Sequence, residues 1–89
     1  MSYRIEFAPR AVRNFKSLDG SIRRRIARRI EARADNPYPQ RIKKIEGEEE
    51  LYRLRVGDYR ILYQVKGKIF IVLIVGIGHH RDVYRRIGG

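Results

Sequence analysis

The segment LYRLRVGDYRILYQV, residues Leu51–Val65, decides the fold, because two alternating arms flank the pair Gly57-Asp58. Alternation of apolar and polar residues on both sides of a two-residue turn predicts a β-hairpin. Glycine at the first turn position favours a type II′ turn, which needs a positive φ there. Counting outward from the turn places Arg55 directly opposite Arg60.

Side chains of a strand alternate between the two faces of a sheet. One face of the hairpin is therefore apolar and should lie in the core: Tyr52, Leu54, Val56, Tyr59, Ile61 and Tyr63. The other face, called here the arginine face, carries Arg53, Arg55, Arg60, Leu62 and Gln64. Opposed like charges destabilise a sheet, whereas guanidinium groups bind phosphate well. The pattern indicates a phosphate site; the alternative is arginines that point into solvent or pair with Glu46, Glu48, Glu49 or Glu50.

Length and composition describe a small and strongly basic protein. Its 89 residues suit a single domain, residues 1–89, with one core. Twenty-one Lys and Arg against ten Asp and Glu give a net charge of +11, which favours a nucleic-acid partner. An acidic membrane surface or an acidic protein partner is the alternative. The chain has no cysteine, no secretion signal and no apolar run of membrane-spanning length, so we expect a cytoplasmic protein.

The residues before the hairpin predict one strand and two helices. Residues 3–7 alternate as a short strand with one apolar face. Pro9 suits the first turn of a helix that ends at Asp19-Gly20, and Ser21 is a good N-cap for a second helix that Asn36-Pro37 ends. The arginines of the second helix are expected on its outer face: Arg23, Arg24, Arg25, Arg28, Arg29 and Arg33.

The remaining segments complete the sheet. A connector spans residues 40–50, and Lys66-Gly67-Lys68 predicts a second turn. The apolar run IFIVLIV, residues 69–75, predicts a central strand covered on both faces, with a flexible break at residues 76–78 after it. The expected fold class is α+β with the order β-α-α-β-β-β, in which a hairpin of helices packs on one face of a small, mainly antiparallel sheet.

This order, the segment IKKIEGEEELYRLRVGDYRILYQV and the ending GHHRDVYRR together resemble the RelE/ParE superfamily of toxins from prokaryotic toxin–antitoxin pairs. The resemblance covers nearly the whole chain and implies a RelE-like fold, similar to that of small microbial ribonucleases. For the RelE branch it implies an endoribonuclease that cleaves mRNA in the ribosomal A site, uses no metal or other cofactor and inhibits translation. It also implies an acidic, RelB-like antitoxin as partner.

Two other functions stay open at this point. The ParE branch shares the fold but inhibits DNA gyrase and lacks the ribonuclease residues. A basic RNA-binding module without catalysis is the third alternative, and binding that falls steeply with salt would be its signature.

The resemblance further implies a catalytic site made of Arg53, Arg55, Arg60, His80 and Tyr84. The arginines would hold the scissile phosphate and stabilise the charge that develops on it. Arginine stays protonated at any useful pH and is a poor general base, although RelE enzymes often have lysine at the first two positions. Proton transfer would then fall to Tyr84, to a histidine, or to the ribosome and substrate; of His79 and His80 we favour His80.

Further basic residues are candidates for contacts to RNA phosphates, which need positive charge but no sequence reading. They are Arg24, Arg28, Lys43, Lys44 and Arg81. The alternative for the helix arginines is an ordinary solvated face. The acidic run Glu46–Glu50 lacks the spacing of metal ligands, so we expect a solvated loop there and no metal site.

Overall fold

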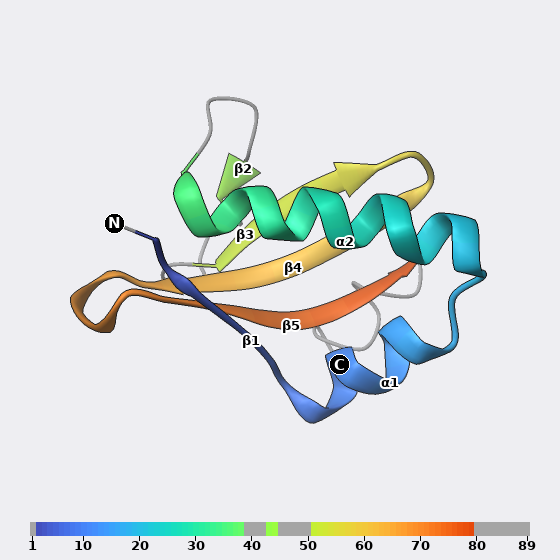
Figure 1. Ribbon diagram of the computed structural model, residues 1–89, viewed down its shortest axis with the longest axis horizontal. Coiled ribbons are helices and arrows are strands. Elements are labelled where there is room, and N and C mark those ends of the chain that lie inside the picture. The colour runs from blue at the N-terminus through green and yellow to red at the C-terminus, as the bar shows by residue number, and fades with distance from the viewer. Residues whose placement is uncertain (1, 39–42, 45–50, 80–89) are drawn as a thin grey trace.

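A computed structural model of the chain describes residues 2–38, 43–44 and 51–79 and shows two helices on a mixed sheet (Figure 1). The elements are β1 (Arg4–Phe7), α1 (Pro9–Lys16), α2 (Gly20–Asp35), β2 (Lys43–Lys44), β3 (Leu51–Val56), β4 (Tyr59–Lys66), the 3-10 turn η1 (Gly67–Ile69) and β5 (Ile71–His79). The strand order is β1-β5-β4-β3-β2. Only β1 and β5 pair in parallel, which confirms the α+β class and the mainly antiparallel sheet.

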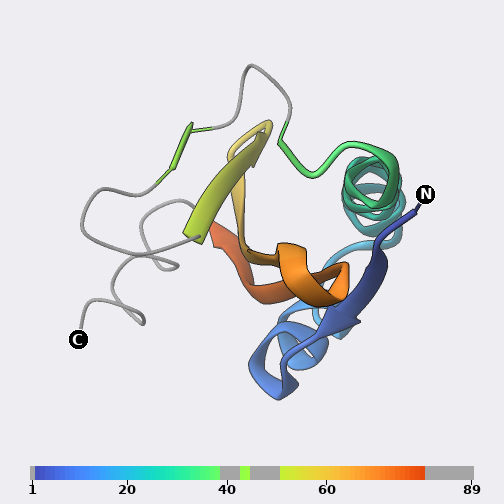
Figure 2. The ribbon, with the colours of Figure 1, turned by 90° about the vertical axis from the view of Figure 1, so that its left-hand side faces the viewer.

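Both helices lie on the same side of the sheet (Figure 2). They contribute Ala11, Ile26 and Ile30 to the core, where these residues meet the apolar side chains of the sheet. The buried sheet residues in that core are Leu54, Val56, Ile61, Tyr63, Val65, Val72, Ile74 and Ile77. The predicted apolar face of the hairpin is therefore the face that the helices cover.

The hairpin has the predicted register. Val56 pairs with Tyr59 and Arg55 with Arg60, and the pairing continues outward without a shift to Leu51 and Gln64. Gly57 has a φ of 59°, whereas Asp58 does not have a positive φ, as a type II′ turn requires. The spacing of the two arms and the choice of glycine were sufficient to predict this pairing.

The predicted boundary between the helices was wrong by a few residues. Helix α1 ends at Lys16, where the Ser17 hydroxyl donates a 2.8 Å hydrogen bond to the Asn14 carbonyl. Helix α2 begins at Gly20 instead of after Ser21, because the carbonyl of Asp19 already accepts the N–H of Arg23 at 2.8 Å. The predicted end at Asn36-Pro37 is confirmed, since α2 ends at Asp35.

The last strand differs more from the prediction. It begins at Ile71, and Ile69 and Phe70 lie in the turn with 60% and 45% of their surface exposed. It also continues through residues 76–78, which were predicted to be a flexible break, because Gly76 pairs with Leu62 and Gly78 with Arg60. Its central position between β1 and β4 is confirmed. The glycines of residues 76–78 therefore lie within a strand, which is stabilised by pairing with β4.

A short strand interrupts the predicted connector. Strand β2 pairs antiparallel with β3, with Lys43 opposite Arg53 and Lys44 opposite Tyr52. Two residues in a strand give a weak pattern, so the alternation of apolar and polar residues could not reveal it.

Strand β4 is tied to the end of α2 through Tyr63. Its buried hydroxyl donates a 2.9 Å hydrogen bond to the carbonyl of Pro37, and its ring stacks on Tyr52 at 5.8 Å. Burial raises the pKa of Tyr63 to about 12, although Arg33 nearby lowers it in part. Tyr63 is therefore protonated at neutral pH and serves as a hydrogen-bond donor inside the protein.

Within the described residues, neither helix is long and apolar enough to cross a membrane.

Candidate nucleic-acid interface

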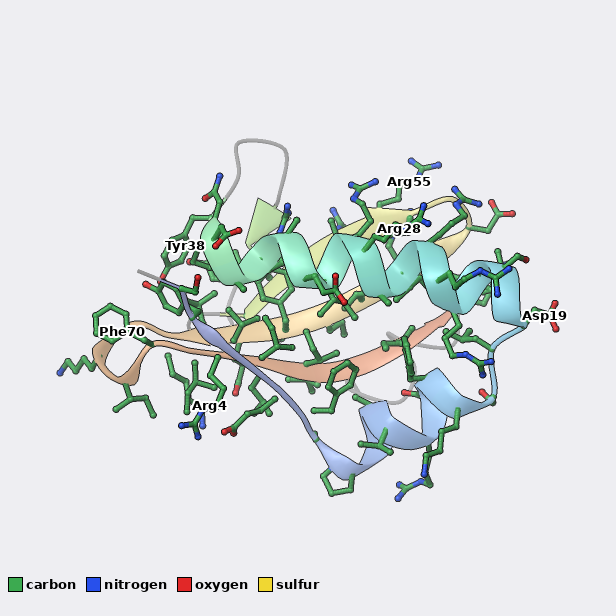
Figure 3. All side chains as sticks on the ribbon, in the orientation of Figure 1. Arg4, Asp19, Arg28, Tyr38, Arg55 and Phe70 are labelled. Atoms are coloured by element: carbon green, nitrogen blue, oxygen red, sulfur yellow. The ribbon has the colours of Figure 1, made fainter. Side chains whose placement is uncertain are left out.

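The arginine face of the hairpin points away from the helices. Arg55 is exposed and lies opposite the half-buried Arg60 in the register, while Arg53 lies opposite Leu62. Figure 3 shows Arg55 at the end of the molecule where β3 turns into β4. The structure thus brings together the three predicted hairpin arginines on one side of a rigid sheet.

The charges of the pair Arg55 and Arg60 are not neutralised within the described part of the chain. The Nε of Arg55 donates to the carbonyl of Gly57 at 3.3 Å, and Nη1 of Arg60 donates to the carbonyl of Tyr59 at 3.3 Å. Neither makes an ion pair with a described carboxylate. The predicted alternative partners at residues 46–50 lie outside the described residues. Two guanidinium groups bonded only to carbonyls keep most of their donors available for an anion.

Strand β5 places a glycine beside Arg60. Its register partner is Gly78, which has no side chain, so β5 places no Cβ next to the guanidinium stem on this face. A glycine at such a point permits close approach of a ligand backbone. The sequence predicted a flexible break at this glycine. Only the pairing of β5 with β4 reveals that Gly78 lies beside Arg60.

His79 lies on the opposite face of the sheet from the arginines. It pairs with Tyr59, a residue of the helix-covered face, and the two rings meet edge to face at 5.9 Å. The register thus places His79 on the face of Tyr59, while the preference for His80 stays a prediction. His80, Arg81 and Tyr84 lie outside the described residues.

Helix α2 presents a second set of arginines to solvent. Arg24 and Arg28 are exposed, as predicted, and so are Arg25 and Arg29. A Cβ placed on Gly57 would lie 3.8 Å from Nη2 of Arg25, so this guanidinium reaches the hairpin turn. Arg25 therefore lies beside the hairpin turn, a position that the run of arginines in the sequence did not predict.

Two arginines of α2 do not lie on its outer face, contrary to the prediction. Nη1 of Arg23 donates to the carbonyls of Lys16 and Leu18, at 3.4 and 3.3 Å, and so satisfies groups at the end of α1. Arg33 is half-buried beside Tyr63. Their position in the helix turns them toward α1 and the sheet, and a run of arginines does not reveal this.

The predicted contacts Lys43 and Lys44 lie in β2 at the outer edge of the sheet, next to β3. In the register Lys43 lies opposite Arg53 of the arginine face, whereas Lys44 lies opposite Tyr52 of the helix-covered face. Among the described residues, no three His, Asp or Glu side chains are grouped as metal ligands.

Comparison with known proteins identifies the family of the chain. The family described as ParE toxin of type II toxin-antitoxin system, parDE, matches residues 5–84. Toxin RelE3 of Methanocaldococcus jannaschii is 34% identical over 85 residues, which cover 91% of this chain and 94% of the relative. This chain belongs to the RelE/ParE superfamily of toxins.

Other members of the RelE/ParE superfamily extend the comparison. The mRNA interferase toxin RelE of Escherichia coli is 25% identical over 80 residues, 88% of this chain and 83% of the relative. The toxin in the crystal structure of the RelB-RelE antitoxin-toxin complex from Methanococcus jannaschii has a TM-score of 0.74 at 32% identity, covering 91% of this chain and 96% of that one. The RelE-like fold predicted from the sequence is confirmed.

Proposed function

We propose that this chain is the toxin of a toxin–antitoxin pair and cleaves mRNA in the ribosomal A site. The observation that carries the proposal is the pair Arg55 and Arg60, which face each other on a rigid hairpin without a described carboxylate to neutralise them. An E. coli relative is an mRNA interferase, and the net charge of +11 suits an RNA-rich target.

The chemistry fits guanidinium groups. The 2′-oxygen attacks the adjacent phosphorus, the bond from phosphorus to the 5′-oxygen breaks, and negative charge builds on the phosphate oxygens. Arg55 and Arg60 hold the phosphate and stabilise that charge, with Arg53 on a neighbouring phosphate. Neither the proton lost by the 2′-OH nor the one gained by the 5′-oxygen can pass through arginine. We assign these transfers to His80 and Tyr84.

The outer arginines of α2 support docking to the ribosome. Arg24, Arg25 and Arg28 form an exposed cationic surface that reaches the hairpin turn through Arg25. RNA backbone in that position would contact the helix and continue onto the arginine face. Lys43, Lys44 and Arg81 are the further phosphate contacts in this proposal, which places the protein in the cytoplasm with its target.

An acidic, RelB-like antitoxin is the proposed partner. The M. jannaschii and Pyrococcus horikoshii neighbours were solved as RelB-RelE complexes. An unneutralised arginine pair on a +11 protein favours an acidic segment that covers it, and electrostatic steering would speed that encounter.

A second candidate function is inhibition of DNA gyrase without RNA cleavage. It is favoured by one observation, the ParE description of the family that matches residues 5–84. The arginine pair argues for the nuclease, because a binding toxin has no need to concentrate charge at one phosphate.

The decisive experiment compares two double variants of strand β4 and its neighbours. Arg55→Ala with Arg60→Ala removes the pair, and Lys66→Ala with Lys68→Ala removes the same charge from exposed residues at the other end of β4. With ribosomes and mRNA, cleavage should fall at least about 100-fold for the arginine variant, as loss of transition-state charge stabilisation predicts. The lysine variant should keep its activity.

Circular dichroism and thermal unfolding would show that both variants fold. A folded arginine variant that cleaves mRNA at the wild-type rate would contradict the proposal. A supercoiling assay with DNA gyrase completes the comparison, since inhibition of gyrase without any ribosome-dependent cleavage would establish the second function.

A further inference from the structure

Among the described residues, the end of strand β5 has a neighbouring strand on one side only. Strand β1 pairs with β5 from Ile71 to Ile74 and then leaves it, since the N–H of Ala8 bonds to the Ile74 carbonyl and α1 begins at Pro9. From Gly76 to His79, β4 is the only strand paired with β5 in the described part of the chain.

One side chain takes the place of the missing strand. Oδ1 of Asn14, on helix α1, accepts the backbone N–H of Ile77 at 3.1 Å. Ile77 is 2% exposed, so without Asn14 this N–H would be buried without an acceptor. The bond joins residues that are far apart in sequence and ties the first helix to the last strand.

The strand end that Asn14 holds is intrinsically weak. Gly76 and Gly78 flank Ile77, and glycine loses more conformational freedom on ordering than any other residue. A strand end with two glycines and one open edge should fray unless another contact holds it.

Asn14 itself is held firmly in place. Ala11 of the same helix is fully buried, and Phe15 meets Phe7 edge to face at 5.7 Å. Arg23 further bonds to the carbonyls of Lys16 and Leu18 at the end of the helix. Helix α1 therefore provides a rigid support for a single hydrogen bond to β5.

We propose that Asn14 is a positioning residue of the arginine site and acts through Gly78 on Arg60. Gly78, the residue after Ile77, pairs with Arg60 in the sheet. Asn14 keeps this glycine in register, so that Arg60 has a paired strand on both sides and no Cβ of β5 beside it. The inference rests on the proposed nuclease function.

The test replaces the acceptor while it keeps the size of the side chain. Asn14→Leu removes the acceptor, and Asn14→Asp retains one. With ribosomes and mRNA, Asn14→Leu should lower kcat about tenfold with less than a twofold change in KM, because a small misplacement in a site is costly to the chemical step. Amide exchange at Ile77 should be roughly tenfold faster. Asn14→Asp should restore both values to within about twofold.

A matched control separates positioning from loss of stability. Ile30→Val alters the core on helix α2, far along the sequence from Asn14, and should lower Tm by a similar amount. If that variant lowers kcat as much as Asn14→Leu does, the effect belongs to stability and the inference is wrong. Wild-type kcat or unchanged Ile77 exchange in Asn14→Leu would overturn it, and so would failure of Asn14→Asp to restore them.

The inference and the proposed function fail in different ways. Inactive Arg55→Ala with Arg60→Ala beside fully active Asn14→Leu would refute the role of Asn14 alone. A wild-type protein that does not cleave mRNA on ribosomes would refute both.

Discussion

Strand β4 has a turn at each end, and each turn contains a residue with a positive φ, a glycine in one and a phenylalanine in the other. At the hairpin end, Gly57 has a φ of 59°, and at the other end Phe70 has a φ of 55°. Left-handed backbone is natural for glycine and unfavourable for a bulky side chain. One turn therefore follows from local preference, whereas the other must be held by the structure around it.

The surroundings of the second turn support that interpretation. Phe70 meets Tyr3 edge to face at 5.4 Å, and its carbonyl accepts the N–H of Arg4 at 2.8 Å. A Cβ on Gly67 would lie 3.6 Å from the hydroxyl of Tyr38, which brings the loop after α2 against the turn. Figure 3 shows Phe70 and Tyr38 at one end of the molecule and Arg55 at the other.

The two ends also differ in chemistry. The hairpin end concentrates cations, whereas the other end carries the exposed large hydrophobic residues of the described chain: Tyr38, Ile69 and Phe70. At the hairpin end, local preference specifies the turn, and Arg55 and Arg60 make no ion pair with a described carboxylate. Tertiary contacts at the other end are needed for the turn itself, so we expect substitutions there to act on stability.

The largest effect is expected at Tyr63, whose hydrogen bond to Pro37 holds the segment that packs against the second turn. Tyr63→Phe removes the bond to Pro37 and leaves a buried carbonyl without its donor, which should lower the free energy of unfolding by about 1–3 kcal/mol. Urea unfolding measures the loss. Tyr59→Phe, at the hairpin end, is the control and should change stability by less than about 0.5 kcal/mol, because its hydroxyl makes no hydrogen bond within the described chain.

The same residue predicts a dependence on alkaline pH. The pKa of Tyr63 is about 12 in the folded protein, whereas the ordinary value for tyrosine is 10.0. As the pH rises, the unfolded chain therefore loses this proton before the folded protein does. The stability that this group contributes is complete below pH 10 and is lost as the pH rises through 12, an amount on the order of 2–3 kcal/mol. Unfolding curves between these values should fall more steeply for the wild type than for Tyr63→Phe; parallel curves would contradict the assignment.

A smaller effect is expected at the glycine of the hairpin. Gly57→Ala introduces strain at a positive φ and should cost about 1–2 kcal/mol in unfolding free energy. The added Cβ meets Nη2 of Arg25 at 3.8 Å, an ordinary contact, so strain and not a clash is the cause. Chemical denaturation of Gly67→Ala, whose φ is not positive, supplies the control; equal losses in the two variants would refute the difference between the turns.

The smallest effect is expected from the opposite substitution, which places glycine at the left-handed position of the second turn. Phe70→Gly relieves the left-handed strain but loses the contact with Tyr3 and gives the unfolded chain more freedom. These terms oppose one another, so the free energy of unfolding should change by less than about 1 kcal/mol. A loss above 2 kcal/mol, measured by denaturation, would mean that packing of Phe70 outweighs its backbone strain.

The two turns differ in how well the sequence alone predicts them. The pairing of Arg55 with Arg60 was predicted because a two-residue turn with glycine specifies its register locally. The start of β5 was not, because Ile69 and Phe70 have the composition of a strand although tertiary contacts place them in a turn. The predicted break at Gly78 was wrong for the same reason, because this glycine lies in a strand only through its pairing with Arg60 of β4.

The candidate site divides in a similar way. Arg53, Arg55 and Arg60 share a face because alternation along a strand is a local rule. Arg25 and Asn14 could not be selected from the sequence, because each reaches its partner, Gly57 or Ile77, across a gap that only packing closes.

Local sequence patterns were sufficient to predict the α+β class, the hairpin with its register, the arginine face and the basic character of the protein. Each follows from periodicity, turn preference or charge, which act between near neighbours in the chain. The tertiary structure decided which glycines lie in a strand, which arginines face solvent, and which side chain supports the end of β5. Those outcomes depend on contacts between distant segments, and such contacts form only when the helices pack on the sheet.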